Sequence, residues 1–268
     1  MPETILPQIA GIIVLGAAAQ WLAWRAALPS ILLLLLCGLI AGPVTGWLNP
    51  DELFGDLITP AVSIAVALIL YEGGLTLKLS EITRVRGVVR NLVTIGALVT
   101  WFVGALAAYL IFDLSIALAA LLGAVLVVTG PTVIVPLLHH IRPTGSVGAA
   151  LKWEGIVIDP IGALLTVLIF EVIVIGKAGE ATAHVALAVA KTVFLGGGLG
   201  VVAAGLLVLL IKRYWIPDYL QNAVSLMLVV GTFVLSNLMQ EESGLLAVTV
   251  MGFALANQRW ADVGEIVE

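Results

Sequence analysis

Residues 147–175 read VGAALKWEGIVIDPIGALLTVLIFEVIVI, and two carboxylates, Glu154 and Asp159, stand inside this apolar run. A helix needs about 20 predominantly apolar residues to cross a bilayer, so the run is long enough to span. Ionisable groups at membrane depth are costly and are therefore candidates for function. The stretch predicts a transmembrane helix that carries an acidic site near its middle.

The composition of the whole chain agrees with a membrane protein. Of its 268 residues, 61% are hydrophobic and 11% are charged, whereas soluble domains carry about a quarter charged residues. This composition excludes a soluble enzyme, a nucleic-acid-binding protein and a disordered chain. The single cysteine, Cys37, lies in an apolar run, so neither a disulfide framework nor a cysteine-based metal site is expected. We therefore expect an all-α polytopic membrane protein without a cofactor.

Apolar runs separated by Pro, Gly and charged clusters predict about nine transmembrane helices. They are continuous and lack the ten-residue alternation of an outer-membrane barrel, so helices rather than strands are indicated. The predicted segments are residues 4–25, 29–47, 58–78, 89–112, 115–138, 147–175, 182–211, 219–240 and 243–258.

The basic residues sort by loop. Ten of the 12 Lys and Arg residues fall in the loops after the first, third, fifth, seventh and ninth segments or, like Lys152, beside them. Because Lys and Arg accumulate on the cytoplasmic side, this pattern predicts an N-terminus outside and Glu268 inside a cell (inner) membrane.

Two short segments resemble one another at a spacing of 214 residues. The run that begins near Pro29 has Gly38 where the run that begins near Ser243 has Gly252, and the two cross the membrane in opposite directions. Inverted repeats of this kind are common in secondary transporters, although similar Leu- and Gly-rich stretches also arise by coincidence. We expect a single transmembrane domain over residues 1–268, with a first repeat at about 29–175. A second repeat would begin at about 243 and remain incomplete, as in the N-terminal portion of a longer transporter.

Residues 128–132 read VTGPT and predict a discontinuous helix. Gly130 and Pro131 leave nearby carbonyl groups without helical partners, which is tolerated at membrane depth only where the backbone is buried in protein or lines a cavity. Thr129 would lie about 21 Å into its segment and Asp159 about 20 Å into the antiparallel one, so the two can meet. Carbonyl oxygens, the Thr129 and Thr132 hydroxyls and one carboxylate suit a hard cation such as Na⁺.

The same carboxylate can hold a proton. Burial disfavours its charged form, whereas a bound cation favours that form. A site that holds either Na⁺ or H⁺ is an exchanger, and low pH should weaken its cation affinity. The alternatives are a structurally paired Asp159 and a simple kink at Gly130 and Pro131. Glu154 lies about 140° around the helix from Asp159, so it either orients the site or joins the coordination.

Other polar positions give weaker signals. Glu72 lies in the cytoplasmic half of its segment, where a pathway role and an interfacial position are equally compatible with the sequence. His139 and His140 are expected to be solvated at the interface. The glycine cluster at residues 196–200 predicts close helix packing rather than a nucleotide loop.

These motifs together resemble bacterial sodium/proton exchangers of the monovalent cation:proton antiporter-1 family. The resemblance implies about a dozen spans arranged as inverted repeats, usually in a homodimer, and exchange of Na⁺ (or K⁺) for H⁺ in pH homeostasis. By resemblance, Asp159 matches the essential carboxylate, Thr129 the oxygen donor of the unwound helix, and Glu154 the orienting glutamate. The motifs that carry it are LPSILLLLLCGLIAGP (28–43), LYEGGL (70–75), TGPT (129–132), EGIVIDP (154–160) and SGLLAVTVMG (243–252).

Three positions depart from the family pattern. Gly130, Gly155 and Ile158 stand where the family commonly has Asp, Ser and Asn, so the presumed site lacks three polar groups. Gly155 is also a candidate for lining the ion pathway. Exchange of Na⁺ (or K⁺) for H⁺ is the leading hypothesis. A different carrier or channel on a related fold and an inactive truncated fragment are the alternatives.

Overall fold

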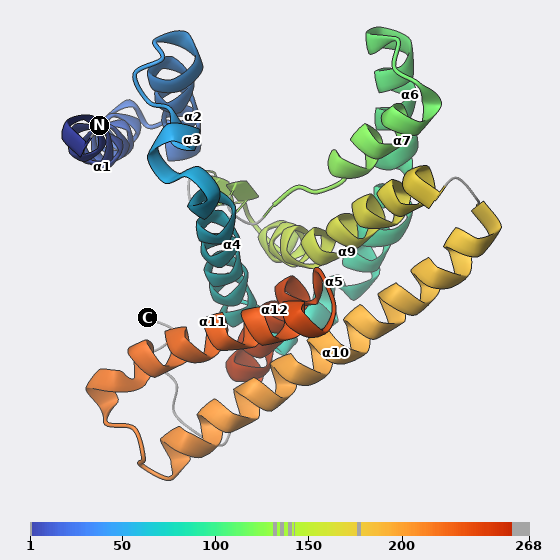
Figure 1. Cartoon of the computed structure of the whole chain (residues 1–268). Coiled ribbons are helices and arrows are strands. Elements are labelled where there is room, and N and C mark those ends of the chain that lie inside the picture. Colours follow the sequence, from blue (N-terminus) through green and yellow to red (C-terminus); the bar gives the residue numbers. More distant parts are fainter. Residues whose placement is uncertain are drawn as a thin grey trace. The chain divides into compact units, whose positions relative to one another are not determined.

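The computed structural model describes residues 2–130, 133–134, 137–138, 141, 143–175 and 178–258 (Figure 1). Within these ranges the regular structure is entirely helical. The elements are α1 (Pro2–Ala26), α2 (Ser30–Leu39), the π-helical turn η1 (Ile40–Val44), α3 (Pro50–Phe54), the 3₁₀ turn η2 (Gly55–Leu57), α4 (Ile58–Leu75), α5 (Leu79–Asn91), the π-helical turn η3 (Leu92–Gly96), α6 (Ala97–Phe112), α7 (Ile116–Val125), α9 (Val147–Ile175), α10 (Ala178–Lys212), the 3₁₀ turn η4 (Asp218–Leu220), α11 (Gln221–Met239) and α12 (Ser243–Asn257).

The described helices confirm the all-α membrane fold. Six of them, counted with their continuations, are long and apolar enough to cross a bilayer. Three shorter apolar helices, Ser30–Val44, Ile116–Val125 and Ser243–Asn257, account for the remaining predicted segments. Large apolar side chains such as Phe102, Ile111 and Phe194 are exposed, which lipid contact explains and water would penalise.

One predicted boundary is wrong by ten residues. The fourth segment was expected to begin at residue 89, whereas the continuous helix begins at Leu79. Its first part, α5, contains Arg84, Arg86 and Arg90, which a search for apolar runs passes over. The apolar side of α5, with Val85 and Val89, is nevertheless buried.

The chain divides into two compact units, Met1–Ser63 with Val135–Pro143, and Ile64–Ile134 with Thr144–Glu268. In the first unit α1 packs against α2. There, Gln8 donates a hydrogen bond from Nε2 to the Trp47 carbonyl at 3.0 Å.

The core of the second unit surrounds α12. Leu70 of α4, Leu207 of α10, Val229 of α11 and Met251 of α12 are all fully buried in one cluster. Helix α12 packs against both α10 and α11, and the three lie close together in Figure 1. Gly196 and Gly200 of α10 face the α12 backbone, which confirms the predicted packing role for those two glycines.

A second apolar cluster fixes α9, the helix that carries both carboxylates. Val85 and Val89 of α5 pack there with Trp153 and Ile156 of α9. The Trp153 ring also meets the Phe253 ring of α12 edge to face, with centroids 5.7 Å apart. Helix α9 is therefore anchored to α5 and α12 over the turns around Glu154.

Candidate ion-binding site

The segment that follows α7 leaves the helical conformation beside α9. The Ser115 hydroxyl caps the start of α7 by accepting a hydrogen bond from the Leu118 amide at 3.4 Å. Helix α7 ends at Val125, and residues 128–130 are not helical. The Val133 and Ile134 amides then donate to the Gly130 carbonyl at 3.3 and 3.4 Å, so helical bonding resumes there. Pro131 and Thr132 lie outside the described residues.

Gly130 gives the interruption its backbone geometry. Its φ is +64°, in the left-handed region where a glycine carries no steric penalty. No described residue donates a hydrogen bond to the Val128 or Thr129 carbonyl. At membrane depth a backbone carbonyl must be satisfied by some partner.

Helix α9 runs through Pro160 without interruption and presents a strip of small residues to this segment. A Cβ at Gly155 would lie 3.4 Å from Ile134, and a Cβ at Gly162 would overlap Val128 Cγ2. At about 100° per residue, Asp159 lies about 40° from Gly155 and about 60° from Gly162 around the helix, and between them along its axis. Asp159 therefore belongs to the face of α9 that packs against both ends of the interruption.

The Asp159 carboxylate has no bonded partner within the described residues. Asp159 is half-buried and lies twelve residues after Val147, about 18 Å along a helix of 29 residues. No hydrogen bond or ion pair joins it to the described part of the chain. Nor does any group of three or more His, Cys, Asp or Glu side chains in that part converge on a metal geometry. Carboxylate and carbonyl oxygens are hard donors, so a half-buried carboxylate on this face of α9 is chemically able to hold a hard cation or a proton.

Glu154 and Thr129 are brought together directly. The Thr129 hydroxyl donates to Glu154 Oε1 at 3.1 Å. Glu154 is buried, with 9% of its surface exposed, whereas Thr129 is exposed. This bond fixes the Glu154 carboxylate against the interrupted segment and connects α9 to it.

The remaining predicted positions lie in different surroundings. Glu72 of α4 is exposed and its carboxylate has no bonded partner among the described residues, although its neighbour Gly73 packs against Ile156 of α9. Ile158 is 1% exposed, so an apolar side chain fills the position where the family commonly has Asn. His139 and His140 lie outside the described residues.

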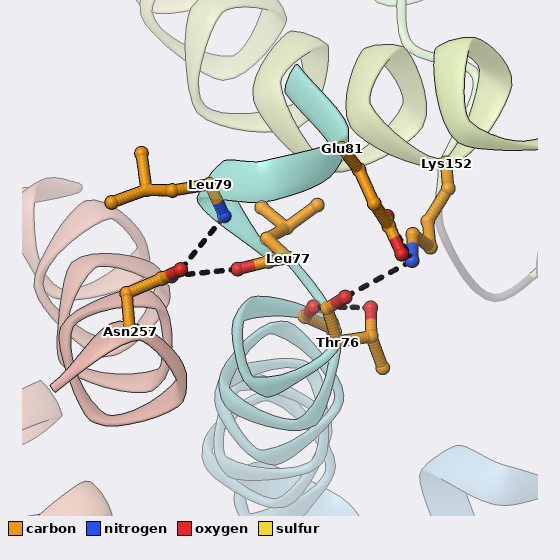
Figure 2. Close-up of polar contacts among 7 residues, drawn as sticks. Thr76, Leu77, Leu79, Glu81, Lys152 and Asn257 are labelled. Carbon is orange, nitrogen blue, oxygen red and sulfur yellow. Dashed lines mark hydrogen bonds and ion pairs between the residues drawn. The ribbon is translucent and has the colours of Figure 1, made fainter. Parts of the chain in front are cut away.

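Glu81 and Asn257, which the sequence did not single out, take part in contacts that join the ends of helices. Glu81 of α5 pairs with Lys152 of α9, and Asn257 of α12 binds the turn between α4 and α5 (Figure 2). Their partners are far away in the sequence, so no local pattern reveals them. The contacts place the end of α4, the start of α9 and the end of α12 together.

The sequence matches the family model described as "Sodium/hydrogen exchanger, transmembrane" over residues 10–265. The chain belongs to the sodium/hydrogen exchanger family. Its fold is similar to the structure of the sodium proton antiporter MjNhaP1 from Methanocaldococcus jannaschii at pH 8, with a TM-score of 0.73 and 25% identity. That alignment covers 95% of this chain and 62% of the antiporter.

Two similar sequences carry the names of antiporters. The Na(+)/H(+) antiporter 1 of Methanocaldococcus jannaschii is 30% identical over 159 residues, which is 59% of this chain and 37% of that protein. The K(+)/H(+) antiporter NhaP of Alkalimonas amylolytica is 27% identical over 259 residues, 93% of this chain and 43% of that protein. The chain thus spans less than two thirds of the length of these relatives.

Proposed function

We propose that this exchanger-family chain carries the ion site of an antiporter that exchanges Na⁺ (or K⁺) for H⁺, with Asp159 holding the two ions in turn. One observation supports the proposal: Gly155 and Gly162, which flank Asp159 along α9, pack against Ile134 and Val128 at the two ends of the interrupted segment. Relatives named as Na⁺/H⁺ and K⁺/H⁺ antiporters support the exchange and leave the choice of cation open.

Each residue has a separate role in this proposal. Asp159 supplies the negative charge, and the Thr129 hydroxyl, the neighbouring carbonyls and Thr132 supply neutral oxygens that suit a hard cation. When the cation leaves, burial disfavours the bare carboxylate, which then takes up a proton. Glu154 orients Thr129 through their hydrogen bond and does not carry the transported ion.

The three departures from the family pattern reduce the number of side-chain oxygens that could bind the cation. Gly130, Gly155 and Ile158 bring no side-chain oxygen to the site. The cation is therefore held by backbone carbonyls and hydroxyls around a single carboxylate. We expect such a site to discriminate modestly between Na⁺ and K⁺, and Glu72 and Gly155 remain candidates for its approach path.

The test is exchange by the complete native gene product in proteoliposomes that contain a pH-sensitive dye. Addition of NaCl or KCl to the unmodified protein should change the internal pH, and Asp159→Asn should abolish the response because the charge is lost. Glu171→Gln is the matched control, since Glu171 lies on the same helix away from the interrupted segment, and it should retain exchange. Full exchange in the Asp159→Asn protein would remove this residue from the mechanism.

The same measurement separates the alternatives. A channel or uniporter on the related fold would pass cations without coupled proton movement. A protein that inserts but moves neither ion would be an inactive member of the family.

We also propose that the short helices Ser30–Val44 and Ser243–Asn257 are corresponding elements of two inverted repeats, the first at about 29–175. Shifted by 214 residues, their bounds agree to within one residue, and Gly38 falls on Gly252. The repeat predicts that the two helices cross in opposite directions, with the N-terminus outside the cell membrane and residue 268 inside. Labelling of single cysteines by impermeant reagents on intact cells and on inverted vesicles tests this orientation.

A homodimer is proposed from the family resemblance alone. Measuring the mass of the protein in detergent tests whether it is a homodimer.

A further inference from the structure

The turn between α4 and α5 is held by side chains from two other helices. Figure 2 shows Lys152 of α9 and Asn257 of α12 reaching this turn. We call the turn backbone at residues 76–79, with Glu81, Lys152 and Asn257, the turn clasp. The clasp residue Lys152 lies near the start of α9, two residues before Glu154.

Lys152 makes the charged half of the clasp. Its Nζ lies 2.7 Å from Glu81 Oε2 and donates a hydrogen bond to the Thr76 carbonyl at 3.0 Å. Thr76 directly follows α4, where helix carbonyls lack partners and carry partial negative charge. The lysine side chain is 22% exposed, so its charge is partly shielded from water. The Lys152 ammonium group therefore neutralises the Glu81 carboxylate and satisfies the Thr76 carbonyl that follows the end of α4.

Asn257 makes the neutral half. Its Nδ2 donates to the Leu77 carbonyl at 2.7 Å, and its Oδ1 accepts from the Leu79 amide at 2.7 Å. Leu79 is the first residue of α5, whose amide has no helical partner. The amide side chain thus satisfies one carbonyl of the turn and the first amide of α5, and it fixes the turn to α12.

Lys152 and Glu154 hold α9 from nearly opposite sides. Two residues correspond to about 200° around a helix, so the two side chains leave α9 in different directions. Lys152 is bound to the turn clasp, and Glu154 accepts from Thr129 beside the interrupted segment. Rotation of the start of α9 would lengthen both contacts at once.

We propose that Lys152 is a positioning residue for the ion site: by holding α9 to the turn clasp, it keeps Glu154 in register with Thr129. This inference rests on the proposed function, because the ion site is the one assigned there. Lys152 touches neither ion. Its loss should weaken cation binding while leaving the chemistry of Asp159 intact.

The experiment compares substitutions at Lys152 and Glu81 in proteoliposomes containing the complete native gene product. Lys152→Met and Glu81→Gln should each raise the apparent KM for the transported cation about three- to tenfold, with the maximal rate within about twofold. Lys152→Arg should restore the KM because a guanidinium can pair with Glu81 and the Thr76 carbonyl. Lys78→Met is the matched control. The Lys78 residue is exposed on the same turn and its ammonium group has no bonded partner among the described residues, so loss of that side-chain charge should change neither parameter.

A second readout does not require transport. Cations that bind the folded protein raise its unfolding midpoint, so the midpoint can be followed against NaCl or KCl at constant ionic strength. The Lys152→Met curve should shift to higher cation concentration by the same factor as the KM. If the unmodified protein moves no ions but its midpoint responds to cation, the proposed exchange is wrong and the shift still tests Lys152.

Two results would overturn the inference. One is a folded Lys152→Met protein with an unchanged KM and an unchanged cation response. The other is an equal loss of rate and stability that Lys152→Arg does not restore, which would make the residue purely structural.

Discussion

The hydroxyl of Thr129 is the residue-level connection between the interrupted segment and α9. Thr129 is exposed, yet its hydroxyl donates a hydrogen bond to Glu154 Oε1 at 3.1 Å. Because the hydroxyl proton is used in this hydrogen bond, the Thr129 oxygen can act towards any other group only through its lone pairs, as a hydrogen-bond acceptor or as a cation ligand. The buried Glu154 carboxylate thus sets the direction in which the Thr129 hydroxyl points, and Asp159 has no bonded partner among the described residues.

Substitution of Thr129 tests this division of roles. Thr129→Val keeps the shape but removes the hydroxyl, so it should raise the apparent KM for the cation by roughly tenfold, the equivalent of about 1.4 kcal/mol. Thr129→Ser keeps the hydroxyl and should stay within about threefold of the unmodified protein. Cation-dependent pH changes in proteoliposomes give both values, and equal behaviour of the two variants would count against a ligand role for Thr129.

At the scale of elements, α4 and α12 meet through their backbones. A Cβ at Gly74 would lie 2.6 Å from the Thr249 carbonyl and 3.0 Å from the Phe253 amide, and one at Gly252 would overlap the Tyr71 carbonyl. Small residues at such crossings let membrane helices approach closely. Tyr71 adds a buried hydrogen bond to Ser225 of α11, 2.5 Å between the oxygens.

Gly74→Ala should therefore separate α4 from α12. The new methyl group meets backbone atoms that cannot rotate away, and overpacking of this kind costs about 1–3 kcal/mol. Gly87→Ala in α5 is the control, because no atom lies within 4 Å of its Cβ position. The unfolding midpoint in detergent should fall for Gly74→Ala only, and equal midpoints would contradict the close crossing.

Most of the spanning helices could be predicted from the sequence because they are apolar runs with clear breaks. The start of α5 was missed, since Arg84, Arg86 and Arg90 hide its buried side. Neither the hydrogen bond between Thr129 and Glu154 nor the turn clasp could be predicted from the sequence, for a different reason. Contacts between distant residues depend on how helices rotate against one another, and α9 is too uniformly apolar for its pattern to fix that rotation.

At the scale of the whole molecule, the ends of helices predicted to lie on one side of the membrane do meet. Thr76, Lys152 and Asn257 come from three separate spans and belong to one polar cluster. A missed or extra span between them would have placed one of these ends on the opposite side. The side of the membrane that this cluster faces stays a prediction from the basic loops.

Exchange through one carboxylate predicts a pH dependence with a definite sign. In the proposed mechanism protons and cations compete for Asp159, so lowering the pH on the side from which the cation binds should raise the apparent KM for the cation, by at most about tenfold per pH unit. Raising the cation concentration should recover the maximal rate. Initial rates in proteoliposomes at several fixed pH values check this, and a KM that stays constant across pH would rule out a shared site.

The hydrogen bond from Asn257 to Leu77 spans 180 residues of sequence. At about 5–20 residues per second, a ribosome needs roughly 9–36 s to travel from one partner to the other. During that interval the Leu77 carbonyl and the Leu79 amide have no α12 side chain to pair with, and water at the bilayer surface must serve them. Membrane insertion of this chain therefore proceeds with an open turn, and its closure is a late event in biogenesis.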